Sequence, residues 1–145
     1  MPHVKKMPAA PPRPDRDLVK RMRMYQVATA LIDLAWDDAE ILLHHPITKD
    51  SASQLFTAVV SIAANLAEGY SRSSGRDRAR IFEYALGSAR ESTVWYEAVA
   101  RVLPEGTLEA RSESLEEIKR MLLATIPRER SRLIRPAKSQ ASGKE

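Results

Sequence analysis

The sequence predicts an all-helical domain whose long helices pack as a bundle. Apolar side chains recur at three- and four-residue steps in four segments, which is the spacing of one buried face of a helix. Aromatic residues make up only 6% of the chain, while the strong helix formers Ala, Leu, Glu and Arg are plentiful. The first segment alone predicts a helix about 43 Å long, which is too long for a compact mixed domain and natural for a bundle.

The chain has 145 residues and a mass of 16.3 kDa, which fits one globular domain. It contains no cysteine, which excludes disulfide frameworks, thiolate nucleophiles and cysteine-based metal sites. No apolar run approaches the roughly 20 residues that cross a bilayer, and the N-terminus lacks the apolar core of a signal peptide. We therefore expect a cytoplasmic protein with no membrane partner.

The first helix is predicted over residues 16–44 and follows a segment that has little to bury. Residues 1–14 carry five prolines and are expected to be a disordered basic arm, so the folded domain is placed at 15–127. Pro46 ends the helix. The predicted core stripe of this helix is Leu18, Met22, Tyr25, Ala28, Ile32, Ala35, Ala39 and Leu42.

The second helix is predicted over residues 51–68. Ser51 and Gln54 form the Ser-x-x-Gln pattern of a capping box, in which side chains satisfy free amide groups at a helix start. Gly69 is predicted to be a left-handed C-cap, a position that favours a residue without a side chain. The helix therefore has a recognisable start and a recognisable end.

Two further helices are predicted over residues 75–103 and 108–126. Ser74 is the expected N-cap of the third helix, and the polar turn before it is short enough to make the second and third helices antiparallel neighbours. Pro127 is expected to end or bend the fourth helix, which leaves residues 128–145 as a disordered basic tail.

Charge is divided unevenly along the chain, although the formal total is only +4. Residues 1–24 carry a balance of +5 and residues 128–145 a balance of +4, so the body between them is acidic. Attraction to a phosphate backbone is therefore expected from the two ends and from local patches. Two interpretations stay open: the ends bind nucleic acid, or they only keep a small domain in solution.

A local patch is predicted at the turn between the second and third helices, where four arginines stand against Asp77. The functional interpretation is a phosphate-binding surface, and the alternative is a solvated face balanced by nearby glutamates. Together with basic residues near the two chain ends, the candidate nucleic-acid-binding residues are Arg72, Arg76, Arg78, Arg80, Arg128, Arg130, Arg132, Lys20, Arg21 and Arg23.

No constellation of catalytic or metal-binding residues is found in the sequence. His44 and His45 are adjacent and diverge around a helix, so they cannot both face one metal. The nucleophile pattern Gly-x-Ser-x-Gly and a phosphate loop with its Lys-Ser/Thr are absent. Glu68 and Glu91 fall about 22 Å apart along a hairpin that turns near Arg72, too far for a shared substrate. We expect no enzymatic activity, no metal and no cofactor.

Polar residues inside the apolar stripes have a structural interpretation. Glu68 is expected to pair with arginines at the start of the third helix, which ties down the turn. Ser88 and Glu91 are expected to bond Gln54 or a neighbouring subunit and so to set the register of the two helices.

A motif spans the second and third helices. It reads Ser-Ile-Ala-Ala-Asn-Leu-Ala-Glu-Gly over residues 61–69, followed by an arginine and then by Gly-Ser-Ala-Arg-Glu over residues 87–91. The motif resembles that of the four-helix-bundle proteins of the 23S ribosomal RNA intervening-sequence type, which reads Ser-Ile-x-x-Asn-Ile-Ala-Glu-Gly, then Arg, then Gly-Ser-x-x-Glu. The matching positions, for which the resemblance implies structure and no established catalysis, are Asn65, Glu68, Gly69, Arg72, Gly87, Ser88 and Glu91.

The resemblance implies an antiparallel up-down-up-down four-helix bundle that assembles into a ring, typically a homopentamer. It also suggests a relation to the accessory variability protein of diversity-generating retroelements, a basic pentameric bundle that binds a reverse transcriptase and nucleic acid. The sequence departs from the family in its second helix, where Gln-Leu-Phe-Thr-Ala over residues 54–58 stands in place of Gln-Leu-x-Arg-Ala. The missing arginine leaves the turn and the chain ends as the better candidates for binding phosphate.

We therefore expect a non-enzymatic oligomeric scaffold that binds RNA or DNA, as an accessory subunit of a reverse transcriptase or another nucleic-acid enzyme. A ring would multiply the modest patch and basic ends of each subunit. The alternative is a protein–protein adaptor whose acidic body docks a basic partner without contacting nucleic acid. Partner binding by the adaptor would survive deletion of the basic ends.

Overall fold

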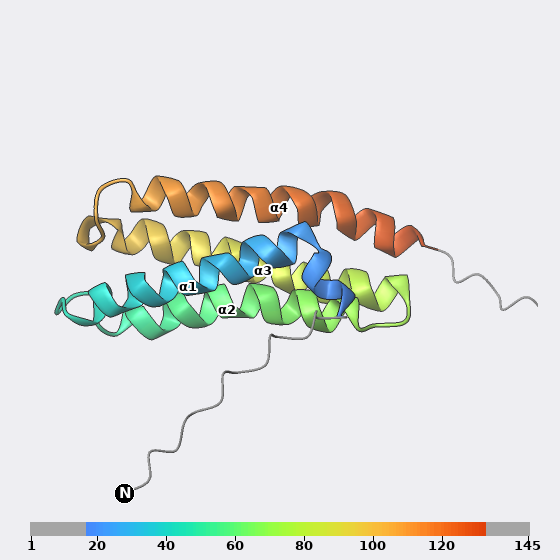
Figure 1. Cartoon of the computed structure of the whole chain (residues 1–145), viewed down its shortest axis with the longest axis horizontal. Helices are drawn as coiled ribbons and strands as arrows, with labels where there is room; N and C mark the ends of the chain where they lie inside the picture. The colour runs from blue at the N-terminus through green and yellow to red at the C-terminus, as the bar shows by residue number, and fades with distance from the viewer. Residues whose placement is uncertain (1–16, 133–145) are drawn as a thin grey trace, which may run out of the picture.

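The computed structural model describes residues 17–132, which form helices joined by short turns (Figure 1). The elements are η1 (Leu18–Arg21), α1 (Arg23–Leu43), α2 (Ser51–Tyr70), α3 (Gly75–Val99), η2 (Ala100–Val102) and α4 (Thr107–Ser131). Within this part of the chain, no helix combines the length and the apolar character needed to span a membrane. The arm predicted over residues 1–14 and the tail beyond Arg132 lie outside the described residues.

The four long helices alternate in direction, so each runs antiparallel to the next along the chain (Figure 1). α2 packs against α1 and α3, and α3 also packs against α4, while α1 meets α4 less extensively. This arrangement confirms the predicted all-helical, antiparallel bundle. The alternation also brings the starts of α1 and α3 to the same end of the bundle as the final turns of α2 and α4.

One apolar core runs through the bundle, and every long helix contributes to it. Burial of each large apolar side chain stabilises the fold by about 1.5–3 kcal/mol. Alanines at buried positions of α1, α2 and α3 let these helices approach closely. The largest fully buried apolar side chains are Leu31, Leu42, Leu55, Val59, Ile62, Leu66, Phe82, Leu115, Ile118 and Leu122.

The single helix predicted over residues 16–44 is two elements in the structure. η1 ends at Arg21, and the backbone of Met22 is extended, with φ −71° and ψ 126°, before α1 begins. A carboxylate oxygen of Asp17 accepts a hydrogen bond from the amide of Val19 at 3.2 Å, which starts the short turn. The break places Val19 in the core, whereas the predicted core residue Leu18 is 52% exposed.

α2 extends beyond its predicted end, and Gly69 lies inside the helix rather than at a left-handed C-cap. Packing requires this glycine, because a β-carbon there would lie 2.6 Å from Cδ1 of Phe82 in α3. At the start of α2, Asp50 makes no side-chain cap bond, and the predicted capping box does not form. Instead, the carbonyl of Thr48 accepts hydrogen bonds from the first amides of the helix.

The register of α2 against α3 differs from the expected one. Ser88 Oγ donates a hydrogen bond to Ser61 Oγ at 2.9 Å, about two turns further along α2 than the expected partner Gln54. Glu91 accepts a hydrogen bond from Nε1 of Trp95 on its own helix at 3.2 Å. α2 continues to Tyr70, so the hairpin turns later in the chain than expected. Each residue of α3 therefore faces a residue nearer the C-terminal end of α2 than the sequence predicted.

α3 begins at Gly75 as predicted, and the hydroxyl of Ser74 accepts a hydrogen bond from the amide of Asp77 at 3.1 Å. The bond satisfies one of the free amides of the first turn, which is what an N-cap does. The helix ends at Val99, and η2 takes the place of its last predicted turn.

α4 begins after Gly106, whose φ of 84° favours glycine. The predicted end at residue 126 is wrong, because the helix continues through Pro127 to Ser131. Proline removes one helical hydrogen bond, but the turn after it packs against the start of α3. There the backbone of Glu129 lies so close to Gly75 that no β-carbon would fit between them. This tertiary contact outweighs the local effect of the proline.

Candidate nucleic-acid interface

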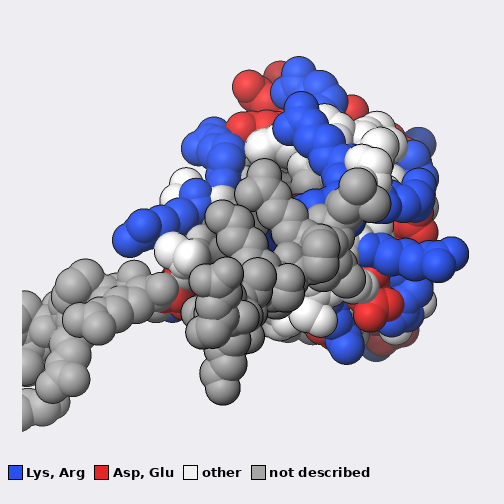
Figure 2. Space-filling model, turned by 90° about the vertical axis from the view of Figure 1, so that its right-hand side faces the viewer, with Lys and Arg blue, Asp and Glu red and all other residues white. Residues whose placement is uncertain are grey.

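The basic residues predicted to bind nucleic acid lie at one end of the bundle, which we call the basic end. It is formed by η1, the start of α1, the turn between α2 and α3, and the last turns of α4. Figure 2 views the molecule from this end and shows Lys and Arg side chains around its rim. The Lys and Arg residues of the basic end are Lys20, Arg21, Arg23, Arg72, Arg76, Arg78, Arg80, Arg128, Arg130 and Arg132. Its Asp and Glu residues are Asp17, Glu68, Asp77, Glu83 and Glu129, and Arg23 at its inner edge pairs with Glu117 of α4.

The opposite end of the bundle, formed by the turn after α1, the end of α3, η2 and the start of α4, has the reverse balance. Its acidic residues are Asp50, Glu97, Glu105, Glu109 and Glu113, and its basic residues are Lys49, Arg101 and Arg111. The bundle therefore carries a charge gradient along its long axis, which steers a polyanion toward the basic end. The sequence located the basic residues, but only the fold unites segments that lie far apart in the chain.

Three of the turn arginines face solvent. Arg76 is exposed, and Arg72 donates a hydrogen bond to Oε1 of Glu68 at 2.7 Å while remaining half-exposed. Glu68 therefore pairs with Arg72 of the turn, four residues ahead of it, and not with an arginine of α3. The guanidinium of Arg80 lies 5.8 Å from the ring centre of Tyr84. Exposed ion pairs contribute only about 0–1 kcal/mol, so a phosphate can replace the carboxylate partner at little cost.

Arg78, the fourth turn arginine, points inward instead. Its guanidinium donates hydrogen bonds to the carbonyls of Tyr70 (3.0 Å) and Arg72 (3.2 Å) and lies 5.1 Å from the centre of the Tyr70 ring. Nη1 is 3.6 Å from Oε1 of Glu129, and both side chains are less than one-fifth exposed. Arg78 therefore secures the end of α2 to α4 and does not belong to the solvent-facing patch. Helical spacing carried a signal of this, because Arg76 and Arg80 are four residues apart and share one face of α3, whereas Arg78 lies between them and points to another side.

Three arginines that were predicted to lie in the tail, Arg128, Arg130 and Arg132, belong to or directly follow α4. Arg128 is exposed, and Arg130 forms an ion pair with Glu83 of α3. Nε of Arg132 lies 3.5 Å from Oε2 of Glu129. Cations are favoured at a helix C-terminus because the helix dipole is negative there, so these residues stabilise the last turn that they occupy.

The third basic segment comprises η1 and the start of α1. Lys20 and Arg21 lie on η1, and Arg23 opens α1 with Nε 3.0 Å from Oε1 of Glu117. The Arg23 side chain is 67% exposed, so this pair is weak. A cation at the start of a helix faces the positive pole of the dipole, which gives Arg23 no stabilising role within its own helix.

The remaining motif residues line the contact between α2 and α3 and the surface beside it. Nδ2 of Asn65 donates hydrogen bonds to the carbonyl and hydroxyl of Ser61, at 2.8 and 3.1 Å, and this hydroxyl also accepts from Ser88. Gly87 and Glu91 are exposed on α3, and a β-carbon at Gly87 would have nothing within 4 Å. The contacts of this chain therefore explain the two serines and Asn65 but not Gly87.

A buried polar network, which the sequence analysis did not predict, joins α1, α3 and α4 at the other end. Asp38 of α1 is 3% exposed, and its Oδ2 accepts hydrogen bonds from the hydroxyl of Tyr96 and from Nε of Arg111, both at 2.7 Å. Nη2 of Arg111 donates to Oδ1 at 3.1 Å, which completes a bidentate pair. The sequence did contain an indication that Asp38 is buried, because helical spacing places it with Leu31 and Leu42 on the buried face of α1.

The pKa values of Tyr96 and Arg111 are both raised within this network. Burial raises the pKa of Tyr96 far above its ordinary value of 10.0, and the hydrogen bond to the Asp38 carboxylate adds to the effect. The hydrogen bond to Asp38 also raises the pKa of Arg111. Both groups therefore keep their protons near neutral pH, and their role is to hold three helices together. Within the described part of the chain, no group of three His, Asp or Glu residues is arranged to hold a metal ion.

Comparison with known proteins gives one match. The family model described as 23S rRNA-intervening sequence protein matches residues 20–124, a range that reaches from η1 into α4. No curated protein and no solved structure matches the sequence. The matched range contains the motif of α2 and α3 and all three members of the buried network. The chain therefore belongs to the 23S rRNA-intervening sequence protein family.

Proposed function

We propose that this protein is a non-enzymatic scaffold that binds RNA or DNA through its basic end. The observation that carries the proposal is the convergence of basic residues from three separate segments toward one end of an otherwise acidic bundle. Arg23 and Arg76 occupy first turns of helices, where a cation is locally unfavourable. A ligand with closely spaced negative charges accounts for both observations.

Binding would be directed at the phosphate backbone. Arg72, Arg76 and Arg80 are exposed on the hairpin. Arg72 and Arg80 pair with the exposed carboxylates of Glu68 and Asp77, which exchange readily with a phosphate oxygen. Contacts of this kind release counterions from the nucleic acid, so affinity falls as salt rises. They position the ligand without reading its sequence, which suits a scaffold better than a sequence-specific regulator.

The proposal includes assembly into a ring, typically of five copies, as an accessory subunit of a reverse transcriptase or another nucleic-acid enzyme. Support comes from one outward face of α3, where Tyr84 is 53% and Val94 62% exposed. Gly87 lies between them, and the absence of a side chain lets another backbone approach closely. A ring would repeat the basic end around one axis, and the joined sites would bind one polyanion far more tightly than a single site.

The experiment compares two triple variants with equal loss of charge. The test variant carries Arg72→Ala, Arg76→Ala and Arg80→Ala. The control carries Lys49→Ala, Arg90→Ala and Arg101→Ala, which removes exposed basic residues outside the basic end. Affinity for a labelled single-stranded RNA and a DNA duplex is measured by fluorescence anisotropy over a range of salt concentrations.

Only the test variant is expected to lose affinity. For the duplex, the slope of log affinity against log salt is expected to flatten by about 2–3, because each lost phosphate contact removes about 0.9. Light scattering of both variants checks that the assembly is unchanged. Equal losses in the two variants, or no loss in either, would contradict the proposal.

The acidic opposite end supports a second candidate function, an adaptor that docks a basic protein. Glu105, Glu109 and Glu113 lie there on exposed positions. Such an adaptor is expected to keep its partner after the arginines of the basic end are replaced, and to release it after Glu105→Lys and Glu109→Lys. Co-purification of a reverse transcriptase with each variant distinguishes the two functions.

A further inference from the structure

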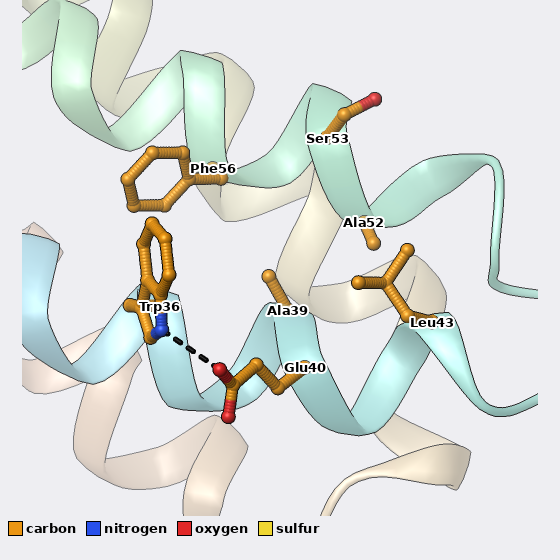
Figure 3. Close-up of a pocket in the computed structure, with 7 residues that line it drawn as sticks. All are labelled: Trp36, Ala39, Glu40, Leu43, Ala52, Ser53 and Phe56. Carbon is orange, nitrogen blue, oxygen red and sulfur yellow. Dashed lines mark hydrogen bonds between the residues drawn. The ribbon is translucent and has the colours of Figure 1, made fainter.

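An apolar groove lies on the outer surface between α1 and α2, in the half of the bundle away from the basic end (Figure 3). Its volume is about 190 Å³, which is below the roughly 300–1,000 Å³ of ordinary small-molecule sites. It therefore fits individual side chains of a peptide better than a cofactor. The groove is lined by Trp36, Ala39, Glu40, Leu43, Ala52, Ser53 and Phe56.

Two aromatic rings form one wall of the groove and are held in place. Trp36 packs edge-on against Phe56, with ring centres 5.5 Å apart and an angle of 82° between the rings (Figure 3). Nε1 of Trp36 donates a hydrogen bond to Oε1 of Glu40 at 2.9 Å. Trp36 is nonetheless 57% exposed and Leu43 56% exposed. A preformed apolar surface of this kind is typical of a docking site.

A row of carboxylates borders the groove on α1. Asp33, Asp37 and Glu40 are exposed, and helical spacing places them beside Trp36 on its solvent side. Among the described residues, neither Asp33 nor Asp37 has an ion-pair partner. The groove is therefore suited to a segment that combines rigid apolar rings with positive charge.

The N-terminal residues of the chain have this composition. The sequence reads Pro-Ala-Ala-Pro-Pro-Arg-Pro over residues 8–14, which contains the spacing Pro-x-x-Pro twice. Lys5, Lys6, Arg13 and Arg16 supply positive charge to the same segment. Grooves lined by aromatic side chains bind Pro-x-x-Pro segments, because such segments are already extended and lose little entropy on binding.

The point where the described chain begins is compatible with this occupant. Asp17 leads into η1, which packs against α1 and α2. Trp36 lies 13 residues beyond Arg23, about 20 Å along α1. An extended proline-rich segment covers about 3.1 Å per residue, so the nine residues from Asp17 back to Pro8 span about 28 Å. A segment of this length is long enough to reach Trp36, whereas Leu43, 20 residues beyond Arg23 and about 30 Å along α1, lies outside its span.

We propose that the groove between α1 and α2 binds residues 8–14 of its own chain. In this arrangement the proline rings pack against Trp36, and Arg13 pairs with Asp33. The direction of the chain fits this placement, since Arg13 lies nearer to Asp17 and meets the start of the acidic row, whereas residues 8–11 lie further along α1 beside Trp36. Docking would withdraw this part of the basic arm from the nucleic-acid interface, so the proposal goes beyond the proposed function.

The experiment uses the absence of cysteine from the full chain. Ala10→Cys provides a single thiol for a bimane label, whose fluorescence is quenched when it contacts a tryptophan. The chain has two tryptophans, Trp36 in the groove and Trp95 on α3, which gives a matched pair of variants. Trp36→Phe is expected to brighten the label several-fold, and Trp95→Phe is expected to leave it unchanged. Circular dichroism checks that both variants fold.

Two further measurements identify the occupant. Pro11→Ser with Pro14→Ser in the labelled chain is expected to brighten the label in the same way, although the groove itself is intact. The quenching is expected to be independent of protein concentration, because the segment belongs to the same chain. Equal brightening by the two tryptophan variants, no brightening by either, or quenching that disappears on dilution would overturn the proposal, the last by indicating a second copy as the occupant.

Discussion

Replacing Arg111 with Met is expected to destabilise the fold by about 3–5 kcal/mol, the cost of leaving one member of a buried ion pair alone. Arg111 supplies two of the three hydrogen bonds that Asp38 accepts, and the Asp38 side chain is only 4% exposed. Tyr96 would remain as its single partner without neutralising the charge. Since whole domains are stable by about 5–15 kcal/mol, this loss is large enough to be measured directly.

The matched control is Arg23→Met. Arg23 also forms an ion pair between α1 and α4, with Glu117 at 3.0 Å, but its side chain is 67% exposed. This control is expected to cost only about 0–1 kcal/mol. Urea unfolding followed by circular dichroism, at one protein concentration, gives both values. Equal costs for the two variants would refute the reasoning that burial makes the Asp38 pair important.

A combined variant tests whether the loss of stability comes from leaving a buried charge without its partner. Asp38→Leu, Tyr96→Phe and Arg111→Met together remove the whole network and leave no buried charge without a partner. This variant is expected to recover most of the loss, because replacing all partners with apolar groups of similar size is close to neutral. A triple variant that is less stable than Arg111→Met alone would contradict this account.

Three further predictions concern the packing of glycines and the buried tyrosine. Gly69→Ala is expected to cost about 1–3 kcal/mol, because the new β-carbon overlaps the Phe82 ring. Gly75→Ala is expected to cost more in the same urea assay, since the overlapping atom is a backbone carbonyl of Glu129, which cannot rotate away. Because the pKa of Tyr96 is raised on folding, its contribution is complete below pH 10 and falls by about 1.4 kcal/mol per pH unit above it. Tyr96→Phe is expected to remove this alkaline loss in a pH series of unfolding curves, and a series unchanged by the substitution would argue against a buried phenol.

The fold class and the family could be predicted because both depend on patterns among residues that are close together in the sequence. Helical spacing of apolar residues and the motif across α2 and α3 required no knowledge of packing. The network of Asp38, Tyr96 and Arg111 could not be predicted in the same way, because its members are 58 and 73 residues apart. Which residues meet across a bundle depends on the rotation of each helix about its axis, and the rotation of α1 differs from the predicted one by enough to bury Asp38.

Two helix ends were also predicted wrongly, because they depend on packing against a neighbouring helix. Gly69 and Pro127 carry local signals that end helices, and both lie inside helices in the structure. In each case a neighbouring helix decides the outcome: the Phe82 ring fills the space that Gly69 leaves open, and the turn after Pro127 packs on Gly75. Local propensities are worth about 1 kcal/mol for glycine and about 3 kcal/mol for proline, which tertiary packing of a whole turn can exceed.

The inward-facing Arg78 connects these corrections to the proposed function. It bonds the carbonyls that end α2 and lies beside Glu129, so the hairpin and the last turn of α4 form one rigid surface. Arginines displayed on that surface need to lose only side-chain freedom on binding, about 0.5–1.5 kcal/mol each. Arginines on an unfolded tail would also require the backbone to be ordered, at about 1–2 kcal/mol per residue. A basic residue that never touches the ligand can therefore strengthen binding, by fixing the backbone that presents Arg72 and Arg76.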